Sequence, residues 1–159
     1  IATNYVPRKM FDISQTNIKP NTTKPDYSQR SLLSGLVKDC SYCITVQSEL
    51  SLPVIVGNNE IYYRKDINFE EGFSWLSYVI SALSMDQSNK VLLDYKARCT
   101  AYILCTKLGV PFQMESEWNN GNPLLHFKNP KAYRQQLKEI RNTAFQLYHN
   151  ILSVAELNH

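Results

Sequence analysis

Hydrophobic and polar positions follow a strand-like pattern in the centre of this chain and a helical period over most of its second half. Short β-branched or aromatic runs at residues 43–47, 53–56 and 61–64 predict strands, and the Gly-Asn-Asn-Glu sequence at 57–60 predicts a hairpin turn between the last two. Apolar residues at helical spacing predict a short helix within residues 30–43.

Three longer helices are expected after the strands. The first spans about residues 69–85 behind the N-cap Asn68, the second spans about 90–108 and ends at Gly109, and the third runs from Pro130 to about 157. The apolar residues of the third helix form one stripe: Tyr133, Leu137, Ile140, Ala144, Leu147, Ile151 and Val154. We therefore predict an α+β fold, with a small, mainly antiparallel sheet of about three strands packed on about four helices.

Length and composition fit a single domain. The chain has 159 residues, of which 43% are hydrophobic and 19% charged. Residues 1–30 carry three prolines among polar residues and predict an extended lead-in, so the domain is expected to span residues 31–159. Because the chain begins with Ile1 and not with Met, we expect it to follow an upstream segment.

Charge and hydropathy limit the classes of partner. The net charge of +3, from 17 basic and 14 acidic residues, is too small to predict nucleic-acid binding without a located patch. No apolar run approaches the roughly 18 residues of a membrane span, so no membrane partner is expected. Four cysteines without a dense framework are typical of reduced thiols, which predicts a cytoplasmic location.

Few residues offer chemistry. The chain has no His-Glu-x-x-His, no Gly-rich phosphate loop and no Gly-x-Ser-x-Gly. The three histidines are scattered: His126, His149 and His159. Cys40 and Cys43 form a Cys-x-x-Cys, which is compatible with a redox pair or with half of a zinc site. Cys99 and Cys105 lie six residues apart on a predicted helix, a poor geometry for chelation, and Cys105 is interpreted as a small core residue.

Several segments are similar, in order and spacing, to one known family. They read FDISQT at residues 11–16, AYILCTKLG at 101–109 and LKEIRNTA at 137–144. In this order they resemble ArdC-type antirestriction proteins over residues 5–152. The resemblance implies that residues 31–159 form a zinc-peptidase-like domain of the ImmA/IrrE kind, with a zincin-like (gluzincin-like) fold. In that family such a domain follows a single-stranded-DNA-binding domain.

The departures from the family pattern fall on its zinc site. Active relatives carry His-Glu-x-x-His on the first long helix, where this chain reads WLSYVISA at residues 75–82. Ser77 and Ser81 stand at the two ligand histidines, and Tyr78 stands at the general-base glutamate. A serine hydroxyl is not among the usual zinc donors, and a phenol with a pKa of about 10 is a poor base near neutrality.

The second long helix departs in the same way. Where the family has acids, one of which is the third zinc ligand, this chain has Lys96 and Arg98. A cation at that place would repel a metal ion, and we expect Arg98 to fill the vacancy and to pair with Asp94 at i+4 spacing or with another acid. The resemblance thus implies a degenerate site without catalytic residues, without zinc and without another cofactor. An active zinc metallopeptidase with atypical ligands, drawn from His126, His149 or the cysteines, is the alternative.

The expected function is that of a non-catalytic module in a mobile-element protein of the antirestriction or conjugation type. It would associate with a protein partner, or with single-stranded DNA through the upstream domain. A basic set on and before the last helix would contact the DNA backbone, or would only be a solvated face: Lys128, Lys131, Arg134, Lys138 and Arg141. A further alternative is a peptide-binding pseudoenzyme whose old cleft is lined by Trp75, Tyr78 and Trp118.

Overall fold

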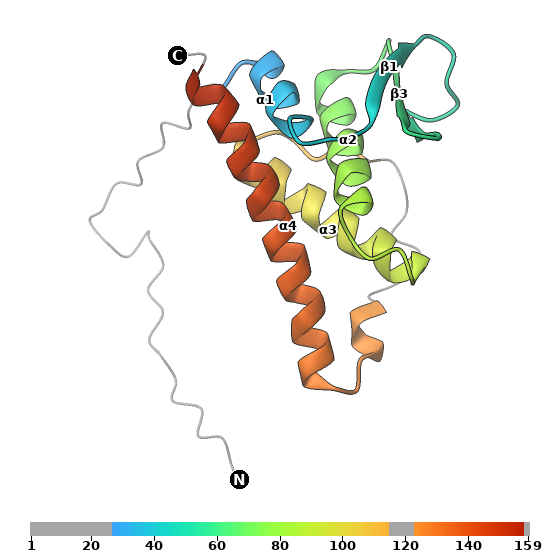
Figure 1. Cartoon of the computed structure of the whole chain (residues 1–159), viewed down its shortest axis with the longest axis vertical. Coiled ribbons are helices and arrows are strands. Elements are labelled where there is room, and N and C mark those ends of the chain that lie inside the picture. The colour runs from blue at the N-terminus through green and yellow to red at the C-terminus, as the bar shows by residue number, and fades with distance from the viewer. Residues whose placement is uncertain (1–26, 115–122, 158–159) are drawn as a thin grey trace, which may run out of the picture.

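The computed structural model of the chain describes residues 27–114 and 123–157 (Figure 1). The elements in chain order are α1 (Gln29–Leu36), β1 (Cys43–Gln47), β2 (Val54–Val56), β3 (Glu60–Arg64), α2 (Phe69–Leu83), α3 (Lys90–Leu108), the 3-10 helix η2 (Pro123–His126) and α4 (Pro130–Leu157). The predicted α+β class, with about three strands and about four helices, is confirmed. The predicted lead-in lies outside the described residues up to residue 26, and its last two residues belong to α1.

The sheet is mixed, so the expectation of a mainly antiparallel sheet is wrong. Strands β2 and β3 form the predicted antiparallel hairpin, and Asn59 takes the left-handed φ of 59° in its turn. The strand order is β1-β3-β2, and β1 pairs with β3 in parallel. The chain reverses after β1 and again after β2, so β1 and β3 run the same way. Because β3 inserts between the other two strands, its pairing with β1 is parallel.

The helix ends follow the predicted signals closely. Asn68 Oδ1 accepts a hydrogen bond from the Glu71 amide at 2.8 Å, and α2 ends at Leu83, two residues before the predicted end. Helix α3 begins and ends where it is predicted, with Gly109 as its C-terminal cap at a φ of 72°. Each cap satisfies backbone groups within a few residues of itself, so the sequence alone can indicate where it lies.

The elements stack in one continuous series. Helix α2 lies between the sheet and α3, while α4 packs on α3 and on α1 (Figure 1). Among the largest fully buried side chains are Leu36, Ile61, Phe73, Leu104 and Ile151. Helices α1 and α4 approach closely at Gly35, where an added Cβ would lie 2.4 Å from the Ile151 Cα.

The predicted apolar stripe of α4 is buried only in part. Ile140, Ala144, Leu147 and Ile151 lie in the core, as predicted, but Leu137 is exposed. Helix α1 covers the C-terminal half of α4, and its Gly35 lies against Ile151 there. The N-terminal half of α4 therefore leaves more of its surface to solvent than the sequence pattern indicates.

Candidate functional site

The two serines that the sequence resemblance predicts at ligand positions are packed inside the molecule. Ser77 and Ser81 are both fully buried on α2. The Ser81 hydroxyl donates to the Ser77 carbonyl oxygen at 2.7 Å, within the same helix. The Ser77 hydroxyl has no hydrogen-bond partner among the described residues. Both positions therefore act as small packing residues of α2, and neither supplies a usual metal ligand.

Tyr78 stands beside these serines and joins α2 to α3. Its hydroxyl donates to Asp94 Oδ1 at 2.8 Å, and Arg98 Nε donates to Asp94 Oδ2 at 2.9 Å. The Arg98 guanidinium also lies over the Tyr78 ring, 5.4 Å from its centroid. The predicted pairing of Arg98 with Asp94 is confirmed. We call Tyr78, Asp94 and Arg98 the α2–α3 clasp.

The chemistry of the clasp is structural. Burial, followed by the hydrogen bond to Asp94, raises the pKa of Tyr78 to about 12, so the phenol stays protonated at neutral pH. Both carboxylate oxygens of Asp94 already accept hydrogen bonds from within the protein. Neither residue is thus arranged to activate water in the way that a general base must.

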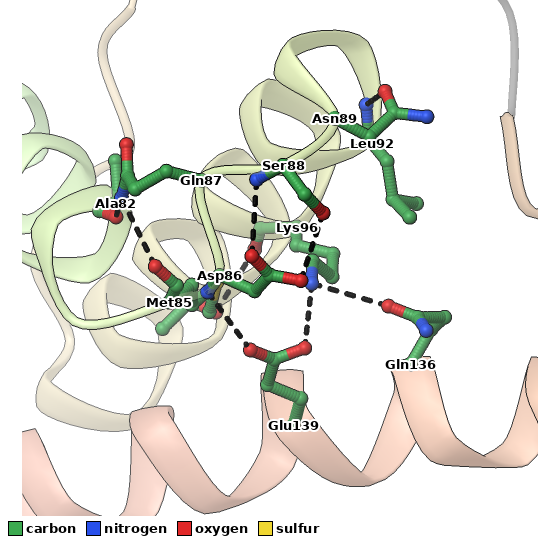
Figure 2. Close-up of polar contacts among 11 residues, drawn as sticks. Ala82, Met85, Asp86, Gln87, Ser88, Asn89, Leu92, Lys96, Gln136 and Glu139 are labelled. Carbon is green, nitrogen blue, oxygen red and sulfur yellow. Dashed lines mark hydrogen bonds and ion pairs between the residues drawn. The ribbon is translucent and has the colours of Figure 1, made fainter.

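The resemblance suggests that Lys96 lies at the former zinc site, but its side chain faces α4. Its side chain is only 3% exposed, and its ammonium group reaches across to α4 (Figure 2). There it contacts Glu139 Oε2 at 2.5 Å and Gln136 Oε1 at 3.1 Å. The other oxygen of Glu139 accepts a long, 3.4 Å hydrogen bond from the Asp86 amide in the α2–α3 loop. Lys96 therefore fastens α3 to α4 and does not share a site with Arg98.

The predicted basic set is exposed, and its members within α4 share one side of the helix. All five side chains are exposed: Lys128, Lys131, Arg134, Lys138 and Arg141. The four within α4 recur at intervals of three or four residues and so share one side of the helix, opposite Ile140 and Leu147 in the core. Within residues 27–114 and 123–157 none of the five takes part in an ion pair. We call this side the basic face of α4.

An exposed aromatic ring continues the same side of α4. Phe145 follows Arg141 by four residues and is 61% exposed. Its ring meets that of His149, with centroids 4.2 Å apart at an interplanar angle of 66°. Sequence reasoning missed Phe145, although its place outside the predicted apolar stripe was visible as a signal.

The remaining candidate ligands are spread over the fold. Among the described residues no group of three or more His, Cys, Asp or Glu side chains is placed to hold a metal ion. Cys40 lies in the connection between α1 and β1, Cys43 is the first residue of β1, and Cys99 and Cys105 lie on α3. Cys105 is fully buried, and burial raises the pKa of its thiol to about 11, which confirms its interpretation as a core residue.

Two other sequence predictions concern aromatic and histidine side chains. Trp75 and Tyr78 meet edge to face, with centroids 5.9 Å apart, whereas Trp118 lies outside the described residues. His126 ends η2 and His149 contacts Phe145, while His159 also falls outside the described range. The described part of the chain contains no helix that is both long and apolar enough to cross a membrane.

Comparison with protein-family models, with curated proteins and with solved structures finds no match for this chain.

Proposed function

We propose that this chain is a non-catalytic module that associates with nucleic acid through the basic face of α4. The observation that carries the proposal is the uncompensated charge of that face. Lys131, Arg134, Lys138 and Arg141 share one exposed side, and Glu139 is the only acidic residue between Lys131 and His149. Because Glu139 pairs with the buried Lys96, its negative charge is neutralised away from the row of cations.

The position of Lys131 argues against a role of this cation in helix stability. The row begins in the first turn of α4, which contains no acidic residue. Cations near a helix N-terminus oppose the helix dipole, at a cost of about 0.3–1 kcal/mol each. Lys131 therefore does not favour the helix itself, and it lies where the same dipole attracts phosphate groups.

The non-catalytic part of the proposal rests on residue chemistry in the clasp and beside it. The family's two ligand positions hold buried serines, and its general-base position holds Tyr78, whose pKa is about 12. The Asp94 carboxylate accepts hydrogen bonds from both Tyr78 and Arg98. We therefore favour a zincin-like domain whose peptidase site has been replaced by packing contacts.

The proposed setting follows the sequence resemblance. We place the chain with ArdC-type antirestriction proteins, as an ImmA/IrrE-like domain of a cytoplasmic mobile-element protein. The order and spacing of the segments at residues 11–16, 101–109 and 137–144 support this placement. In that setting the module would hold nucleic acid beside an upstream single-stranded-DNA-binding domain.

Salt dependence of oligonucleotide binding tests the α4 face. A protein that neutralises single-strand phosphates shows a slope of about −0.7 per contact in a plot of log affinity against log salt. We expect the triple variant Arg134→Ala, Lys138→Ala, Arg141→Ala to lower the size of this slope by about 2. A matched control removes three exposed cations elsewhere: Arg30→Ala, Lys65→Ala, Lys90→Ala. Absence of binding at low salt, or an equal loss in the control, would refute the proposal.

Zinc content tests the non-catalytic part separately. Elemental analysis of the protein, purified without chelator, is expected to find zinc well below one equivalent. Near one equivalent, retained after dialysis, would favour the alternative of a metallopeptidase with atypical ligands. Substitution of His126, His149 and Cys40 in turn would then identify the ligands.

A further inference from the structure

An aromatic ring stands exposed at the end of the row of cations on α4. Phe145 lies one turn beyond Arg141, and the two share a helix side with Lys138. The ring is 61% exposed, an unusual position for a phenylalanine in a domain that buries Phe73 completely. Nine large apolar side chains are exposed among the described residues, and Phe145 is the aromatic one that lies beside the cations of α4.

The surroundings of Phe145 hold the ring in place. The imidazole of His149, one turn further along α4, meets it edge to face at 4.2 Å between centroids, and the Tyr148 ring lies 6.2 Å from the same imidazole. Rings that are already positioned by neighbours lose less conformational freedom when a ligand stacks on them. The contact with His149 therefore reduces the conformational freedom that Phe145 would lose in a complex.

The spacing along α4 suits an extended strand. With a rise of 1.5 Å per residue, the cations from Lys131 to Arg141 span about 15 Å, and Phe145 lies about 6 Å beyond Arg141. Phosphates of one strand can follow such a straight row of cations while a neighbouring base reaches the ring. In a duplex the bases are stacked on each other and do not offer a free face to a side chain.

We propose that Phe145 is a stacking platform for an unpaired base, so that the basic face of α4 prefers single-stranded nucleic acid over duplex. The inference rests on the proposed function and adds the form of the nucleic acid. Cations supply attraction to phosphate, which both forms share, and the ring supplies a contact that only an unpaired base makes. The ring does so without reading sequence, because every base has a face that can stack.

Fluorescence anisotropy with labelled oligonucleotides tests this inference. The wild-type protein is expected to bind a single strand more tightly than a duplex of the same sequence. The experiment is done with DNA and with RNA oligonucleotides, which shows which of the two single strands the protein prefers. We expect Phe145→Ala to weaken single-strand binding about fivefold or more, the low end for stacking on one base. Duplex affinity and the salt slope are expected to stay unchanged, since the cations remain.

Two further variants control for non-specific effects. Tyr102→Ala removes an aromatic ring that is 54% exposed on α3, away from the basic face, and should leave both affinities unchanged. Phe145→Trp should preserve single-strand binding, and emission from the new indole should be quenched when a single strand binds and not when a duplex binds.

The outcomes distinguish a failure of the stacking role of Phe145 from a failure of nucleic-acid binding by the basic face of α4. If Phe145→Ala changes neither affinity, or weakens single strand and duplex equally, the stacking role is wrong while the cation-dependent binding stands. If the wild-type protein binds neither form at low salt, the proposed function itself fails.

Discussion

Tyr78 shows how a single side chain changes the chemistry available to a helix. A glutamate at this position would offer a carboxylate, whereas the Tyr78 phenol donates a hydrogen bond to Asp94 and stays protonated, with a pKa raised to about 12. The Arg98 guanidinium over the ring favours the phenolate, but burial and Asp94 outweigh it. At this scale the sequence predicted the Asp94–Arg98 pair from its i+4 spacing, but it could not predict that Tyr78 completes the clasp.

The raised pKa of Tyr78 predicts a loss of stability at alkaline pH. Because the folded-state pKa lies above the ordinary value of 10.0, the stabilising contribution is complete below pH 10 and is lost as pH rises through about 12. We expect Tyr78→Phe to show a smaller decline in the free energy of unfolding over this interval than the wild-type protein. Urea denaturation at several pH values measures this decline for both proteins. The contributions of the other tyrosines are common to both and cancel in the comparison. Equal declines would show that Tyr78 does not carry the effect.

The joint between α3 and α4 belongs to the scale of elements. Helix limits could be predicted because caps such as Asn68 and Gly109 act locally. The partner of Lys96 could not, since Glu139 lies 43 residues away and only packing brings the two together. For the same reason the parallel pairing of β1 with β3 escaped prediction, because strand order is a property of the whole sheet.

Loss of the Lys96 ammonium should destabilise the α3–α4 joint. Lys96→Ala leaves the Glu139 carboxylate without its ionic partner, and because that side chain is 28% exposed we expect a cost of about 2 kcal/mol, below the range for fully buried pairs. The double variant Lys96→Met, Glu139→Gln should regain most of this loss, since no charge is then left unpaired. Urea denaturation measures both. A cost under about 0.5 kcal/mol for Lys96→Ala would mean that the ion pair contributes little.

The contact between α1 and α4 gives a second test at this scale. A methyl group at Gly35 would meet the backbone of Ile151 at 2.4 Å, so the helices must separate to admit it. We expect Gly35→Ala to destabilise the protein by about 1–3 kcal/mol despite the higher helix propensity of alanine. Ser34→Ala, at an exposed position of the same helix, is the control and should be close to neutral. A neutral or stabilising Gly35→Ala would contradict the close packing.

At the scale of the whole molecule, the described part of the fold leaves the basic face of α4 exposed. The sheet lies beyond α2, on the far side of the helices from α4 (Figure 1). One side of helix α4 packs against α1 and α3, and its basic face is exposed to solvent. The sequence predicted which cations lie outside the apolar stripe. It could not show that Glu139 is neutralised by Lys96, or that Phe145 is exposed at the end of the row.

The most direct test of the central claim is a map of backbone amide chemical shifts during titration with a short single-stranded oligonucleotide at low salt. We predict that the largest changes fall on α4 between Lys131 and His149, with little change in β1, β2 and β3. Changes centred on the sheet, or no changes at all, would contradict the assignment of nucleic-acid binding to α4.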